Sequence, residues 1–98
     1  MGANGARGEA VAVIAGAERR LCLTLGALAE IETGLGLERL AGLAERMRAL
    51  SGRDLLVVLA ALLRGGGERA LADELASAAV DPREAAEAVA RAFEAAAG

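Results

Sequence analysis

The stretch Ser51–Gly67, with the sequence SGRDLLVVLAALLRGGG, decides the fold of this chain. It holds an unbroken aliphatic run, Leu55–Leu63, which a serine and an aspartate precede and three glycines follow. Ser51 can accept a hydrogen bond from an otherwise unpaired amide, and Asp54 suits the positive end of a helix dipole. The pattern predicts a helix over 52–64. Because that helix is apolar all round, it must be buried on most sides or face a partner, so we expect it at the centre of the domain.

Upstream of this helix, segment 9–24 has the features of a β-hairpin. Residues 9–15 are rich in valine and isoleucine, and in 18–24 leucines alternate with polar residues at the period of a strand. The pair Gly16-Ala17 between the two runs predicts the turn. An isolated hairpin is barely stable in water, so we expect this one to pack against helices.

Apolar residues at helical spacing predict four further helices. Thr24 is the expected N-cap of the first, and Gly34 and Gly36 supply positions for its end. Asp81 followed by Pro82 marks the start of the last. The four segments are 25–33, 37–50, 68–78 and 82–97.

The predicted fold class is therefore mainly α (α+β), with an N-terminal β-hairpin packed on a bundle of four to five short helices. Residues 1–8 are rich in glycine and alanine, and we expect them to form a flexible N-terminal tail. We expect residues 9–98 to form a single domain, since 98 residues leave little room for a second.

The composition argues against several classes of function. Hydrophobic residues make up 55% of the chain and aromatic residues 1%, while histidine and lysine are absent. Without histidine, the side chain that titrates near neutral pH is missing, so we expect no enzyme, no catalytic residues and no cofactor or metal site. A net charge of −3 argues against nucleic acid as a partner. We expect a cytoplasmic protein without a membrane partner, because Leu55–Leu63 is too short to span a bilayer and no secretory leader is recognisable.

Three groups of residues suggest chemistry but have simpler explanations. Gly65-Gly66-Gly67 lacks the spacing and the lysine of a phosphate-binding loop, so helix termination explains it better. Cys22 has Arg20 two residues away but no histidine to activate it, which favours a half-buried strand residue. The acids at 30, 32, 84 and 87 have no metal-site spacing and are typical of solvated helix surface.

Arg46, Arg48 and Arg53 surround a helix–helix junction and suggest a small basic patch. Two helices joined by a short Ser-Gly turn are also found in DNA-binding helix-turn-helix modules. However, the helix that would read the bases is almost wholly aliphatic and offers no Asn, Gln or Lys to base edges. A small DNA-binding regulator is therefore a weaker hypothesis than a protein–protein interaction.

Apolar stripes on the last two helices are the candidate partner-binding residues. A small domain with so little aromatic bulk buries a modest core, and a homo-oligomer or a partner helix would offset that shortfall. Ordinary core packing is the alternative for each residue taken singly. The predicted partner-binding residues are Leu71, Leu75, Val89 and Phe93.

The stretch Arg19–Glu32, RRLCLTLGALAEIE, resembles the signature of a small family from gene transfer agents and related tailed phages. The resemblance extends to Gly8-Glu9, to Ser51–Leu56, to Leu62–Gly67 and to the alanine-rich end, and so covers most of the chain from about Gly8. Members of this family are described as tail proteins and as tail assembly chaperones. The pair Gly16-Ala17 departs from the Asp-Gly or similar polar pair that the family often has at the hairpin turn.

The resemblance implies a non-enzymatic role in building a phage-like tail. Its first form is a chaperone that binds the tape-measure protein and keeps it soluble until tail-tube subunits replace it. The alternative is a structural subunit of the tail, in the tube or at its completion. The implied partners are the tape-measure protein, the tail-tube protein, or both.

Overall fold

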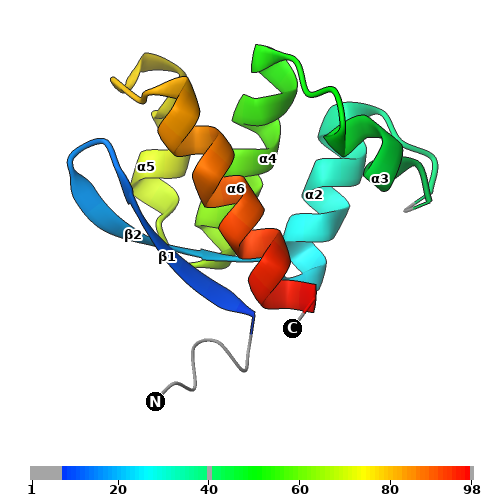
Figure 1. Cartoon of the computed structure of the whole chain (residues 1–98), viewed down its shortest axis with the longest axis horizontal. Coiled ribbons are helices and arrows are strands. Elements are labelled where there is room, and N and C mark those ends of the chain that lie inside the picture. Colours follow the sequence, from blue (N-terminus) through cyan, green and yellow to red (C-terminus); the bar gives the residue numbers. More distant parts are fainter. Residues whose placement is uncertain (1–7, 40, 98) are drawn as a thin grey trace.

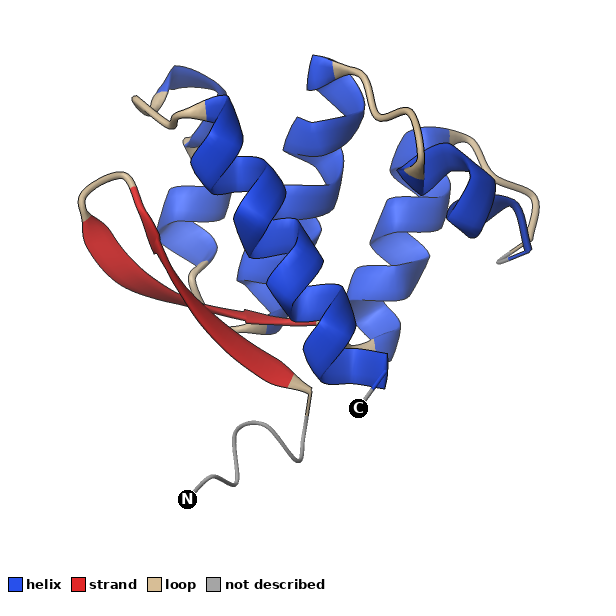
Figure 2. Cartoon of the chain, viewed as in Figure 1, coloured by secondary structure: helices blue, strands red, loops and turns tan. Residues whose placement is uncertain are grey.

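The computed structural model describes residues 8–39 and 41–97. Within them a two-stranded antiparallel hairpin packs on helices, as Figures 1 and 2 show, which confirms the predicted fold class. One hydrophobic core joins the hairpin to the helices. The elements are β1 (Glu9–Ile14), β2 (Ala17–Cys22), α2 (Leu25–Leu35), α3 (Ala41–Met47), α4 (Gly52–Gly65), α5 (Arg69–Asp73), the 3-10 turn η1 (Leu75–Ser77) and α6 (Pro82–Ala97).

The hairpin turn lies one residue earlier than the sequence predicts. Ile14 pairs with Ala17, so the two-residue loop is Ala15-Gly16 and not Gly16-Ala17. Both loop residues have positive φ, 54° at Ala15 and 84° at Gly16. Positive φ at both central residues is the requirement of a type I′ turn, whose twist matches that of the strands.

The second strand also ends earlier than the predicted hairpin. Leu21 is fully buried, but β2 ends at Cys22, and Leu25 is 85% exposed at the start of α2. Thr24 terminates the strand because its hydroxyl accepts a hydrogen bond from the amide of Ala27 at 3.0 Å and caps the helix. Of the leucines predicted to form one face of the strand, only Leu21 therefore lies in β2.

Helix α2 continues to Leu35. Leu37, which was predicted to start the next helix, instead takes part in the ending of α2. Gly36 adopts the left-handed conformation with φ of 70°, and the amide of Leu37 donates to the carbonyl of Glu32 at 2.8 Å. This is a Schellman ending, in which the residue after the glycine closes the preceding helix. The helix predicted over 37–50 is consequently the shorter α3, Ala41–Met47.

Helix α4 is the centre of the fold, as its aliphatic sequence predicts. α2 and α5 lie beside it and α6 packs across it (Figure 1). Five of its residues are buried: Val58, Leu59, Ala61, Leu62 and Leu63. The capping box at its start is complete, because the Ser51 hydroxyl accepts from the Asp54 amide and the Asp54 carboxylate accepts from the Ser51 amide.

The end of α4 touches the backbone of β2, and this explains its glycines. A Cβ at Gly65 would lie 2.1 Å from the carbonyl oxygen of Cys22, and a Cβ at Gly66 would lie 2.2 Å from that of Arg20. Gly67 has φ of 89° and turns the chain into α5. The glycines thus end the helix, as predicted, and also let strand and helix approach more closely than any side chain would permit.

The helix predicted over 68–78 is divided in two, and the last helix matches its predicted span. α5 covers only Arg69–Asp73, and η1 follows at Leu75–Ser77. In α6 the Asp81 carboxylate accepts a hydrogen bond from the Arg83 amide at 2.8 Å, ahead of Pro82 at the first helical position. The tail predicted over 1–8 lies outside the described residues except for Gly8.

Candidate functional site: an apolar groove along the central helix

One face of α4 is only partly covered by the rest of the fold. Leu56, Val57, Ala60 and Arg64 recur at helical spacing along it. Leu56 is 40% exposed, an unusual fraction for a leucine in the central helix. This stripe forms the floor of a groove between α2 on one side and α5 with η1 on the other.

The groove has a volume of about 430 Å³ and is mainly apolar. A second hollow of about 180 Å³ continues it beyond Leu56, toward the start of α6. Leu56 and Leu75 line both. The residues that line the larger hollow are Glu30, Thr33, Gly34, Leu56, Val57, Ala60, Arg64, Ala72, Asp73, Leu75 and Ala76.

Small residues on neighbouring helices set the depth of the groove. A Cβ at Gly34 would lie 2.4 Å from Cγ1 of Val57, so α2 approaches α4 with only the Val57 side chain between the helix backbones at this point. Ala60, Ala72 and Ala76 add little bulk of their own. Aliphatic side chains from another protein are the ligands that such a small-residue groove fits.

An ion-pair cluster closes one end of the groove. The Arg64 guanidinium binds the carboxylate of Glu30 on α2 and that of Asp73 on α5, the latter at 3.1 Å. It therefore joins the two walls of the groove across α4. Each pair is partly exposed to solvent, which limits its contribution to stability but leaves charges at the rim to orient a partner.

The predicted partner-binding residues are placed mainly in the core. Leu71, Leu75 and Val89 are buried, with exposed fractions of 9%, 4% and 3%, and Phe93 is partly buried against the core. Leu75 lines both hollows, but Leu71, Val89 and Phe93 line neither. Only Leu75 thus joins the candidate site, and partner contact by the other three stays a prediction.

The α4 stripe is absent from the predicted partner-binding residues, although the aliphatic sequence of α4 carried a signal for it. A helix that is apolar all round must be covered on every side or must present one side to something else. Leu56 and Val57 are the residues that distinguish the two cases. The sequence pattern of these two residues does not reveal which case applies, because the side that stays open depends on where α2 and α5 pack.

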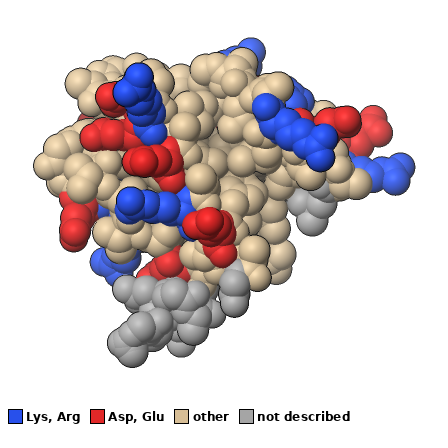
Figure 3. Space-filling model, viewed as in Figure 1, with Lys and Arg blue, Asp and Glu red and all other residues tan. Residues whose placement is uncertain are grey.

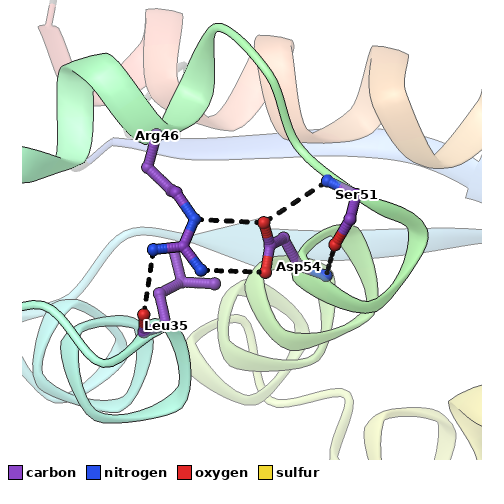
Figure 4. Close-up of polar contacts among 4 residues, drawn as sticks. All are labelled: Leu35, Arg46, Ser51 and Asp54. Atoms are coloured by element: carbon purple, nitrogen blue, oxygen red, sulfur yellow. Dashed lines mark hydrogen bonds and ion pairs between the residues drawn. The ribbon is translucent and has the colours of Figure 1, made fainter.

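Of the three arginines at the helix junction, Arg46 makes contacts within the fold, whereas Arg48 and Arg53 are exposed. Arg46 donates to the Leu35 carbonyl at 3.0 Å and binds both carboxylate oxygens of Asp54, at 3.2 and 3.4 Å. Figure 4 shows this arrangement, which links α3 to the end of α2 and the start of α4. Hydrogen bonds from Arg46 lower the pKa of Asp54, and those from Ser51 lower it further. Arg46 is thus committed to internal contacts.

Cys22 is buried at the end of β2. Burial raises the pKa of its thiol, and the negative charge of Glu9 raises it further. Both effects favour the neutral thiol, whereas a reactive cysteine needs an environment that favours the thiolate. The geometry supports the structural interpretation of this residue.

Comparison with known proteins places the chain in a family. The family model described as "Phage tail tube protein, GTA-gp10" matches residues 7–98. The chain belongs to this family. Neither the curated proteins nor the solved structures yield a significant match. Membership of the GTA-gp10 family confirms the predicted link to phage and gene-transfer-agent tails, but the description names a tube protein and not a chaperone.

In the part of this GTA-gp10 family member that the structure describes, no helix has the length and apolar character needed to cross a membrane. Among the same residues, no group of three or more Cys, Asp or Glu side chains converges in a way that could hold a metal ion.

Proposed function

We propose that this protein is a structural subunit of a phage-like tail, in the tube or at its completion. The match of the tail tube family to residues 7–98 is the observation that carries the proposal. The protein would act by binding other tail proteins and would catalyse no reaction. This agrees with a groove whose charged residues, Arg64, Glu30 and Asp73, already bind one another.

Purified particles test this proposal directly. A structural subunit remains in the finished tail, so quantitative mass spectrometry should find it in fixed proportion to the other tail proteins. Particles that contain only traces of the chain, after assembly in cells that express it normally, would contradict a structural role.

A tail assembly chaperone is the second candidate, and the apolar groove favours it. A groove of about 430 Å³ with small aliphatic residues can receive the apolar face of a helix, which is how a chaperone would hold a long helical tape-measure protein. The test is co-expression with the tape-measure protein encoded nearby. If its solubility is the same with and without this chain, the chaperone role is wrong.

A further inference from the structure

The outer edge of β1 carries backbone groups that point away from β2. Val11 is paired with Arg20, yet the Arg20 amide donates to Glu68 Oε2 at 3.0 Å and the Val11 carbonyl accepts from Arg91 at 3.1 Å. Both groups therefore face outward. Because outward and inward pairs alternate along an antiparallel hairpin, the backbone of Val13 also faces outward.

The two edges of the hairpin differ in what covers them. Gly65 and Gly66 pack against the carbonyls along the edge of β2, and Glu68 accepts its Arg20 amide. Helix α6 packs against β1, but along the β1 edge the bond from Arg91 to Val11 is the one hydrogen bond found among the described residues. A further strand can therefore add at β1 and not at β2. Two copies of the chain can pair by strands only edge to like edge, through β1 of each.

The side chains of β1 suit such pairing. Val11 and Val13 are 39% and 52% exposed on the outer face of the hairpin. Past Glu9 the strand has no charged residue and no proline, which are the features by which exposed edges usually resist pairing. In an antiparallel arrangement centred on Ala12, Val11 of one copy lies opposite Val13 of the other, so that apolar residues contact apolar residues.

Helix α6 flanks this edge with charges of both signs. Glu84, Glu87 and Arg91 line a hollow of about 160 Å³ together with Ala12 and Val13. Figure 3 shows acidic and basic side chains intermingled on the side of the visible face where the hairpin and α6 lie. In a dimer with its two-fold axis through Ala12, the two α6 helices run in opposite directions. Glu84 and Glu87 of one copy then lie toward Arg91 of the other. The surface is complementary to itself.

We propose that β1 is the contact through which two copies of this chain associate. The two strands pair antiparallel about Ala12 and join the two hairpins into a four-stranded sheet. Arg91 moves from the Val11 carbonyl to a carboxylate of the second copy. The proposal does not rest on the proposed tail function, since it concerns the purified chain alone.

Sedimentation of the purified protein over a range of concentrations, with amide exchange, tests the proposal. The wild type should shift from monomer to dimer as concentration rises, and the Val11 and Val13 amides should become protected with it. The inward-facing amides of Ala10 and Ala12 should not change. A chain that stays monomeric at millimolar concentration, or protection of these amides only by another tail protein, overturns the proposal.

Val13→Pro is the decisive variant. Proline removes only the outward amide, so the hydrogen bonds to β2 remain and the variant should melt near the wild-type temperature but stay monomeric. Val13→Thr, which keeps the amide and the branched side chain, is the matched control and should dimerise. A dimer that Val13→Pro leaves intact contradicts the pairing.

An exchange of charges on α6 tests the same dimer without any substitution in β1. Glu87→Arg or Arg91→Glu alone should weaken the dimer, and the double exchange should restore it in part. Equal dimerisation by all three variants would show that α6 is not at the contact.

Discussion

Ala15 has a backbone conformation that does not suit its side chain. It adopts φ of 54° in a turn that favours Asn or Gly at this position. The left-handed conformation brings an alanine Cβ too close to the following carbonyl, at a cost of about 1–2 kcal/mol. The predicted turn was misplaced by one residue for the same reason, since an alanine gives no indication of positive φ.

We therefore expect Ala15→Asn to stabilise the protein by about 0.5–1 kcal/mol, because Asn tolerates this conformation without the flexibility of glycine. Thermal unfolding followed by circular dichroism measures the effect as a rise of a few degrees. Ala17→Asn, at the first strand position after the turn, is the control and should give no such rise.

Gly66 should tolerate no side chain, because the carbonyl of Arg20 occupies the place of its Cβ. Gly66→Ala should destabilise the fold by about 1–3 kcal/mol, the range for an inserted methyl group that forces backbone shifts. Gly52, at the start of the same helix, has open space around it, so Gly52→Ala should be neutral or stabilising. Equal melting temperatures for the two variants would contradict the close contact of strand and helix.

At the scale of elements, α3 differs from the other helices in how it is held. Leu43 is its one buried residue, at 9% exposed. Arg46 supplies the polar links, to the end of α2 through Leu35 and to the start of α4 through Asp54. A bidentate arginine–carboxylate pair fixes direction as well as distance, so this one residue orients the helix.

Arg46→Met should loosen α3 without unfolding the rest. Methionine keeps much of the aliphatic stem but loses the donors, so amide exchange over Ala41–Met47 should accelerate while α4 keeps its protection. Arg48→Met, at an exposed arginine beside it, is the control and should leave exchange in α3 unchanged. Uniform acceleration across the chain would mean that Arg46 supports the whole fold.

Asp54 makes the same junction sensitive to acid. Its pKa is lowered in the folded state, so its contribution to stability is complete above its unfolded pKa of about 3.9 and is lost as pH falls through the folded value. Wild-type melting temperature should drop between neutral pH and about pH 3, and the drop should be smaller in Asp54→Asn. An equal drop in both proteins would remove Asp54 as a cause.

At the scale of the whole molecule, the groove is a surface that the fold leaves open to a partner. Its floor is the α4 stripe around Leu56, and its far end is closed by Arg64 with the carboxylates of α2 and α5. The surface exists because three helices meet at α4 without covering it. Either proposed tail function would use it to hold apolar side chains of another tail protein.

Leu56→Asp should reduce assembly of tails in complementation of a deletion strain, because it places a charge in the groove. Leu25→Asp is the matched control, since Leu25 is 85% exposed and lines neither hollow of the groove. We expect near-normal particle numbers from the control and a loss from Leu56→Asp, with both proteins folded by circular dichroism. Similar yields from the two variants would mean that the groove has no part in assembly.

Local patterns determined much of the architecture by themselves. The caps at Thr24 and Ser51 and the Asp81-Pro82 start are decided by neighbours in the chain, because a cap joins a side chain to an amide two or three residues away. The aliphatic run after Ser51 was enough to place a central helix. The tail family was also recognisable from the order of residues in Arg19–Glu32.

Only the tertiary structure decided which surface faces outward. The same aliphatic character belongs to Leu62, fully buried, and to Leu56, 40% exposed, and packing by α2 and α5 is what separates them. The glycines at the end of α4 are a second example. The sequence predicts that they end the helix, but it does not predict that the backbone of β2 packs against Gly65 and Gly66. Contacts between distant segments are set by the volume and direction of whole elements, which no local pattern encodes.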